Sequence, residues 1–342
     1  SWAQVPETDE QAEFVRAWQP LQPGVQGAMR GAKLMRPARG LALEQRVRGG
    51  WFGLALGDAL GAMSAAVAMK TSPLAWSQHT SLALCLAESL DTLGRSDARD
   101  QIERYWRWFK DGHLSARGQP GETQVSPDVA KALATFRWRG LPVAGSHDPK
   151  DAAATSLPRV LAAALFAGND AAAAIALAAE CARTTHQSPQ ILDTCRAYSA
   201  MLLCALRGQP AQDWLQAVPE PVPGCWTARP LRKDVQAVVA AASAAGDTSA
   251  TRGTIDVVQA LALARRIAGD AQDFDAAIAA VKRSVRDDAA LVAGLVGTIF
   301  GLQHGIDALP ADKLGRLAGR EQLDVAVELC VARLAETGGV TY

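Results

Sequence analysis

The chain has 342 residues, enough for one large domain or two ordinary ones, and its 49% hydrophobic and 20% charged residues fit a globular protein with a substantial core. Its formal net charge is zero and no basic stripe stands out, which argues against nucleic-acid binding. The one local excess of basic residues, at positions 30–39, is explained more simply by a solvated arm than by a phosphate-binding surface.

Cysteine usage and hydropathy indicate a reduced protein without a membrane anchor. The six cysteines form no CxxC pair, and a chain of this length does not need disulfides, so we expect reduced and mostly buried thiols. No secretory signal is visible. The most apolar stretch, residues 289–302, is shorter than the ~20 residues that a membrane span needs. We therefore predict a cytoplasmic protein with no membrane partner.

The chain divides into an extension and one domain. Residues 1–44 are irregular and contain several prolines, so we predict an N-terminal extension there and a single helical domain at 45–342. Abundant alanine and leucine, with few aromatic residues, favour helix. No alternating strand pattern of useful length occurs. The predicted fold class is all-α, with one compact multi-helix domain.

The helical pattern begins at residues 46–69, where five glycines indicate either tightly crossing helices or a break between two helices. A second helix is predicted at 80–93 and is ended by Gly94, and a third at 127–138 begins with the first-turn proline Pro127. The remaining helices are expected as three between 151 and 207, and one each at about 232–245, 254–268, 272–283, 286–303 and 320–336.

Four segments place polar residues in or beside these helices. The first, GWFGLALGDALG at 50–61, contains Asp58, which is either a satisfied core residue that ties two helices or part of a substrate site. The other segments are WSQHTSLALCLAESL at 76–90, then ATSLPRV at 154–160 with THQSP at 185–189, and VRDDAALVAGLVGTIFG at 285–301.

Together these segments resemble the ADP-ribosylglycohydrolase family over residues 46–336. The corresponding family patterns are GxxxGxAxGDALG, then TDDT followed by a helix, then (S/N)Gx(L/M)MR and THxxP, and lastly DxD(S/T) before a helix with glycines four apart. The resemblance implies that Ser156 and His186 lie near ADP-ribose. His186 has a simpler alternative, because a cation at a helix C-terminus is favoured by the helix dipole.

The resemblance also locates a metal site, which this sequence alters. Family members bind two magnesium ions through the acidic pairs of the second and fourth segments, and here Gln78 and His79 replace the first pair. Anchoring the fourth segment on its glycines places Ser284, Arg286 and Asp287 where the family has Asp, Asp and Thr, and a shift of one residue does not restore DxD. Magnesium prefers hard, charged oxygen ligands. We therefore predict no cofactor and no metal, with Gln78, His79 and Arg286 at the former site.

The resulting hypothesis is a pseudoenzyme that binds ADP-ribose, a related nucleotide, or an ADP-ribosylated or other protein partner without hydrolysis. No residue is assigned as catalytic, and the predicted ligand-binding residues are Asp58, Ser77, Gln78, His79, Ser156, His186, Arg286 and Asp287. Arg286 is suited to a diphosphate. Two alternatives stay open: an active hydrolase with non-standard ligands such as His79 with Asp287 or Asp288, and a scaffold whose cleft is closed.

Overall fold

The computed structural model describes residues 41–63, 73–215, 217–240 and 254–336. Within these ranges the chain forms fourteen α-helices and no β-strand, which confirms the predicted all-α fold. The elements are α3 (Leu43–Ala62), α5 (Gln78–Leu93), α6 (Ala98–Asp111), η1 (Gly121–Thr123), α7 (Pro127–Arg139), η2 (Leu157–Arg159), α8 (Val160–Phe166), α9 (Ala171–Ala182), α10 (Pro189–Leu206), α11 (Ala211–Leu215), α12 (Lys233–Ala240), α13 (Val257–Asp270), α14 (Phe274–Ser284), α15 (Ala289–His304), η3 (Ile306–Ala308), α16 (Ala311–Leu314) and α17 (Arg320–Glu336).

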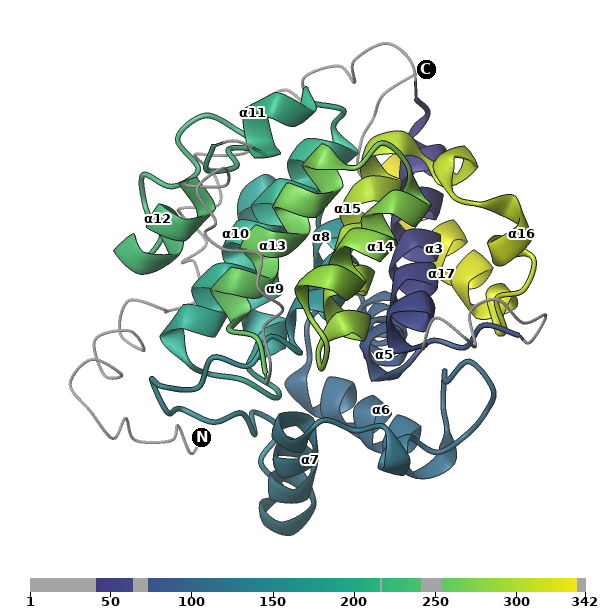
Figure 1. The fold of residues 1–342 in the computed structure, drawn as a ribbon. Helices are drawn as coiled ribbons and strands as arrows, with labels where there is room; N and C mark the ends of the chain where they lie inside the picture. The colour runs from purple at the N-terminus through teal and green to yellow at the C-terminus, as the bar shows by residue number, and fades with distance from the viewer. Residues whose placement is uncertain (1–40, 64–72, 216, 241–253, 337–342) are drawn as a thin grey trace.

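The helices are arranged around α15, which packs against α3, α10, α13 and α14 (Figure 1). Helices α6 and α7 lie at the lower edge of the same view. None of the helices in the described ranges combines the length and the apolar character that crossing a bilayer requires. Of the predicted N-terminal extension, residues 1–40 lie outside the described part of the chain.

Glycines hold α3 and α15 in backbone contact. A Cβ built on Gly53 would lie 2.1 Å from the carbonyl oxygen of Gly297, and one built on Gly49 would lie 2.1 Å from that of Gly301. A real Cβ cannot approach a backbone oxygen so closely, so both helices need glycine at this crossing. Because α3 is continuous from Leu43 to Ala62, the glycines mark a tight crossing and not a break.

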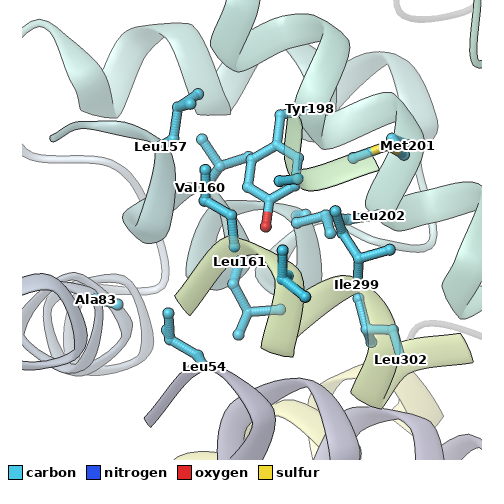
Figure 2. Packing of buried hydrophobic residues seen from close by; sticks show 14 of the residues in the cluster. Leu54, Ala83, Leu157, Val160, Leu161, Tyr198, Met201, Leu202, Ile299 and Leu302 are labelled. Carbon is cyan, nitrogen blue, oxygen red and sulfur yellow. The ribbon is translucent and has the colours of Figure 1, made fainter. Parts of the chain in front are cut away.

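Most buried apolar residues form one cluster around this crossing. Figure 2 shows the ring of Tyr198 reaching from α10 towards Leu161 of α8 and Ile299 of α15, with Leu54 of α3 below them. Each large apolar side chain buried in this way contributes about 1.5–3 kcal/mol relative to exposure. The cluster therefore fixes α3, α8, α10 and α15 relative to one another, and these are the helices that carry three of the four polar segments.

A second, smaller cluster packs α6 and α7 against α5 through residues such as Tyr105, Trp108 and Leu133. Helix α6 was not among the helices predicted from sequence, although it is amphipathic, with a polar outer side and an apolar stripe that faces the core. Its ends are also well marked. The side chain of Asp97 accepts hydrogen bonds from the first backbone N–H groups, and Gly112 ends the helix with a φ of 73°.

The remaining helix predictions agree with the structure to within a few residues. Helix α5 ends before Gly94, whose φ is 63°, and α7 begins at Pro127 and ends before Gly140, whose φ is 67°. Helices α13, α14, α15 and α17 occupy the predicted C-terminal ranges, and short helices and turns fill the proline-containing segment before them. Residues 64–69 of the first predicted helix, and residues 241–245 of the helix predicted at about 232–245, lie outside the described residues.

Candidate functional site

The N-terminus of α5 is built on Asp58 of α3. The Oδ1 atom of Asp58 accepts a hydrogen bond from the Ser77 hydroxyl at 2.7 Å, and Oδ2 accepts from the backbone N–H groups of Ser77 at 3.0 Å and Thr80 at 3.1 Å. The Thr80 hydroxyl adds a fourth bond, at 2.9 Å. A carboxylate at this position also compensates the dipole of α5. Asp58 is 0% exposed, and its contacts are those of a core residue that ties two helices.

Gln78 and His79, which we expected at the positions of the family's acidic pair, lie in the first turn of α5. The Oε1 atom of Gln78 accepts a hydrogen bond from the backbone N–H of Ser126 at 2.9 Å. The ring of His79 is 8% exposed, and its Nδ1 atom has no hydrogen-bond partner in the described part of the chain. Burial lowers the pKa of His79, although the charges of Asp58, Asp128 and Asp288 act in the opposite direction.

A hydrogen-bonded chain of side chains runs beside this turn. The Nε2 atom of His186 lies 2.6 Å from Oδ2 of Asp128, and Nδ1 lies 2.7 Å from the hydroxyl of Thr185. The Thr155 hydroxyl donates to the same oxygen of Asp128. Arg159 donates to Thr185, so Thr185 is free to donate its own proton to Nδ1 of His186. This order assigns the Nε2–H tautomer to His186.

His186 is 0% exposed, and its side chain bonds this network rather than the end of the preceding helix α9. Asp128, in the first turn of α7, is the central residue of the network, and it was missing from the sequence prediction. Burial opposes ionisation of Asp128, but the hydrogen bonds from His186, Ser126 and Thr155, together with the electrostatic attraction of His186, outweigh burial and lower the pKa of the carboxyl. An aspartate directly after a first-turn proline is typical of helix starts in general, so its sequence pattern indicated a cap and no site.

Ser156 takes no part in this network in the described part of the chain. Its hydroxyl is buried at 3.5 Å from the sulfur of Cys195 on α10. Three residues later, the guanidinium of Arg159 lies 5.1 Å above the ring of Tyr105, and its Nε and Nη1 atoms have no hydrogen-bond partner in the described part of the chain. The segment at 154–160 therefore contributes Thr155 and Arg159 to the network, whereas Ser156 packs into the core.

The segment before α15 has both exposed and partly buried charges. We expected Arg286 to face Gln78 and His79; Arg286 and Asp287 are exposed, and the charged group of this segment that acts on the pKa of His79 is Asp288. Asp288 precedes α15 and accepts a hydrogen bond from the backbone N–H of Ile255 at 2.6 Å, and burial raises its pKa.

The predicted residues thus divide into two groups. Asp58, Ser77, Gln78 and His79 come together at the start of α5, near Asp128 and through it His186, whereas Ser156 is buried against Cys195, and Arg286 and Asp287 are exposed. Among the described residues, no group of three or more His, Cys, Asp or Glu side chains is arranged to hold a metal ion.

A family model described as ADP-ribosylglycohydrolase matches residues 39–340. The chain belongs to the ADP-ribosylglycohydrolase family. A solved structure titled "ADP-ribosylglycohydrolase-related protein complex" is similar over 85% of this chain and 98% of its own, with a TM-score of 0.66 and 26% sequence identity. The family resemblance predicted from the four sequence segments is therefore confirmed.

Two curated proteins show the same relationship at lower similarity. The ADP-ribosylarginine hydrolase Tri1 of Pseudomonas putida (strain GB-1) is 24% identical over 292 residues, which are 81% of this chain and 76% of that protein. The ADP-ribosylarginine hydrolase Tri1 of Serratia proteamaculans (strain 568) is 24% identical over 297 residues, or 83% of this chain and 78% of that protein. The ADP-ribosylglycohydrolase domain of this chain therefore has distant relatives that act on ADP-ribosylarginine.

Proposed function

We propose that this chain is an ADP-ribosylglycohydrolase family member that binds an ADP-ribosylated protein, or its ADP-ribose group, without hydrolysing it. The observation that carries the proposal is the first turn of α5, where Gln78 and His79 stand at the positions of the family's acidic pair. Neither side chain supplies a charged oxygen. The amide oxygen of Gln78 is already bonded to the backbone of Ser126, and a histidine nitrogen suits zinc or copper better than magnesium.

The carboxylates that remain near His79 are engaged by protein donors. Asp58 accepts four hydrogen bonds, Asp128 accepts from His186 and Thr155, and Asp288 accepts from Ile255. A magnesium ion needs near-octahedral oxygen ligands to replace part of its water shell. The residues present do not fit a pair of magnesium ions, and we derive no reaction step through them.

The proposed ligand follows from the relatives and from the retained turn. The curated relatives are named for hydrolysis of ADP-ribosylarginine, so a protein modified in this way is the ligand class that we assign. Ser77 and Thr80 keep the hydroxyl character of the family pattern on either side of Gln78 and His79. The Asp128–His186 pair lies beside that turn, and Asp128 retains some exposure of its side chain.

Isothermal titration calorimetry with ADP-ribose, in the presence of magnesium and then of a chelator, tests the proposal. We expect binding of similar affinity under both conditions, and no release of ADP-ribose from a protein carrying ADP-ribosylarginine. The Tri1 protein of P. putida serves as the positive control for release. Magnesium-dependent release by this chain would contradict the proposal, and failure to bind ADP-ribose would favour a scaffold with a closed cleft.

A second candidate, an active hydrolase with non-standard ligands, draws support from one observation. Asp128 and Asp288 both act on the pKa of His79, and their own pKa values are displaced in opposite directions, downward for Asp128 and upward for Asp288. Opposite displacement of two carboxyl groups is the pattern of an acid and a base in one site. This candidate requires turnover that His79→Ala abolishes, and unchanged turnover in that variant would exclude a role for His79.

A further inference from the structure

Helix α7 presents an outer face that the rest of the described protein leaves uncovered. Trp138 is 87% exposed, and the exposed Lys131 and Ala134 lie on the same face at helical spacing. The opposite face carries Val129 and Leu133, which are buried in the smaller core cluster. The helix is thus packed on one side only, and Figure 1 shows it at the edge of the molecule beside α6.

The charges on this outer face are all of one sign. Arg137 and Arg139 flank Trp138 and are exposed, as is Lys131 two turns earlier. None of these three cations has an ion pair within the described part of the chain. The acidic residue of α7, Asp128, lies at the far end of the helix, where it is bonded inward to His186. The outer face therefore offers positive charge that no described residue compensates.

The face is held in a fixed position. Arg99 of α6 donates a hydrogen bond to the carbonyl oxygen of Gly140 at 3.0 Å, and its guanidinium lies 5.8 Å from the ring centroid of Phe136. Gly140 ends α7 in the left-handed conformation, with a φ of 67°. A partner that contacts Trp138 does not have to order this helix first, which reduces the entropic cost of binding.

The residue types of the face are those of a protein-binding surface. Single exposed apolar residues are common and need no explanation. Here, however, the exposed side chain is a tryptophan between two arginines, and tryptophan and arginine are enriched at interfaces and among the residues that dominate binding energy. We infer that the outer face of α7 (Lys131, Ala134, Arg137, Trp138 and Arg139) docks an acidic segment of a partner protein.

The same residue types also occur in single-stranded nucleic-acid sites, where bases stack on aromatic rings. The whole chain argues for a protein instead, because its formal net charge is zero. Nucleic-acid binding depends on many phosphate contacts. The inference goes beyond the proposed function, because it uses none of the residues around His79 and holds whether or not this chain binds ADP-ribose.

Fluorescence anisotropy with the full chain tests the inference directly. The probe is a short fluorescein-labelled peptide of alternating glutamate and leucine, with a lysine–leucine peptide and a single-stranded oligonucleotide as comparisons. We expect the acidic peptide to bind and its affinity to fall as sodium chloride is raised, because the contacting charges are exposed. Trp138→Ser and Arg137→Glu should each weaken binding about tenfold or more.

Val325→Ser is the matched control, because Val325 is an exposed apolar residue of α17, 54% exposed, and outside the proposed face. It should leave the affinity unchanged. All three substitutions are at exposed positions, so we expect each variant to fold as the wild type does, which thermal denaturation checks. No binding of the acidic peptide, equal binding by Trp138→Ser, or tighter binding of the oligonucleotide than of the peptide at this face would each overturn the inference.

Discussion

Replacing Gly297 by alanine should destabilise the protein, although alanine is the better helix former. A Cβ on Gly297 would lie 2.0 Å from the carbonyl oxygen of Gly53, whereas carbon–oxygen contacts between neighbouring backbones are normally about 3.3 Å or longer. Helices α3 and α15 would therefore have to separate by roughly 1 Å. Since the obstacle is backbone and not the end of a flexible side chain, the separation must loosen the core on both sides of the crossing.

The expected magnitude follows from two opposing effects. Overpacking a well-packed core typically costs about 1–3 kcal/mol, and a backbone-on-backbone clash belongs at the upper end of that range. Alanine in a helix interior recovers about 1 kcal/mol relative to glycine. We therefore expect the free energy of unfolding to fall by about 2 kcal/mol. Urea denaturation followed by far-UV circular dichroism measures this as a lower midpoint with an unchanged slope.

Gly294→Ala is the matched control in the same helix. Its added Cβ would gain the same helix propensity, but the nearest atom is the side-chain Cδ1 of Leu54 at 3.2 Å, which can move aside. Its stability should stay within about 1 kcal/mol of the wild type. The reasoning is refuted if the two variants lose equal stability, or if Gly297→Ala is at least as stable as the wild type.

Three further outcomes are expected. Asp58→Ala removes the acceptor for the backbone N–H groups at the start of α5 and should lower the free energy of unfolding by about 3 kcal/mol or more. Asp58→Asn keeps one acceptor oxygen and should lower it less, and thermal denaturation of the two variants measures the difference. Burial lowers the pKa of His79 in the folded protein, so the unfolded chain binds the proton more tightly. The contribution of neutral His79 to the free energy of unfolding should therefore be complete above pH ~6.5 and decline as the pH falls below that value. His79→Gln should then lose less stability than the wild type between pH 7 and 5 in chemical denaturation, and an identical decline would contradict the assignment. Arg265→Met should lower the free energy of unfolding by several kcal/mol, because the buried guanidinium donates hydrogen bonds to four backbone carbonyl groups, those of Trp214, Leu215, Ala217 and Val239. A thermal midpoint equal to that of the wild type would contradict this expectation.

Local sequence signals predicted the helices well, because these signals act over a few residues. Gly94 and Gly140 end their helices in the left-handed conformation that glycine adopts most easily, and Pro127 starts one where its missing N–H costs nothing. Helix α6 was not among the predicted helices, although its signals are equally local: Ile102, Tyr105 and Trp108 lie on one face of an otherwise polar segment, and Asp97 and Gly112 cap its ends.

The residues expected at the family's metal site also show what the sequence could predict and what it could not. The sequence predicts that Gln78 and His79 replace acids of the family pattern, on the basis of the flanking residues of the same segment. It also placed Arg286 beside them, and this stays a prediction, since Arg286 is exposed. The sequence left Asp287 and Asp288 open as partners of His79, and in the folded chain it is the charge of Asp288 that acts on the pKa of His79.

The sequence by itself determined the family, the all-α class and the absence of an acidic residue from the first turn of α5, because each depends on which residues occur in which order. Only the tertiary structure decided what surrounds His79. Asp128 bonds His186 across 58 positions of sequence, and Asp288 joins them from a third part of the chain. The beginnings of α5, α7 and α15 meet at this point because their apolar faces pack elsewhere in the core, and that meeting is a property of the folded chain as a whole.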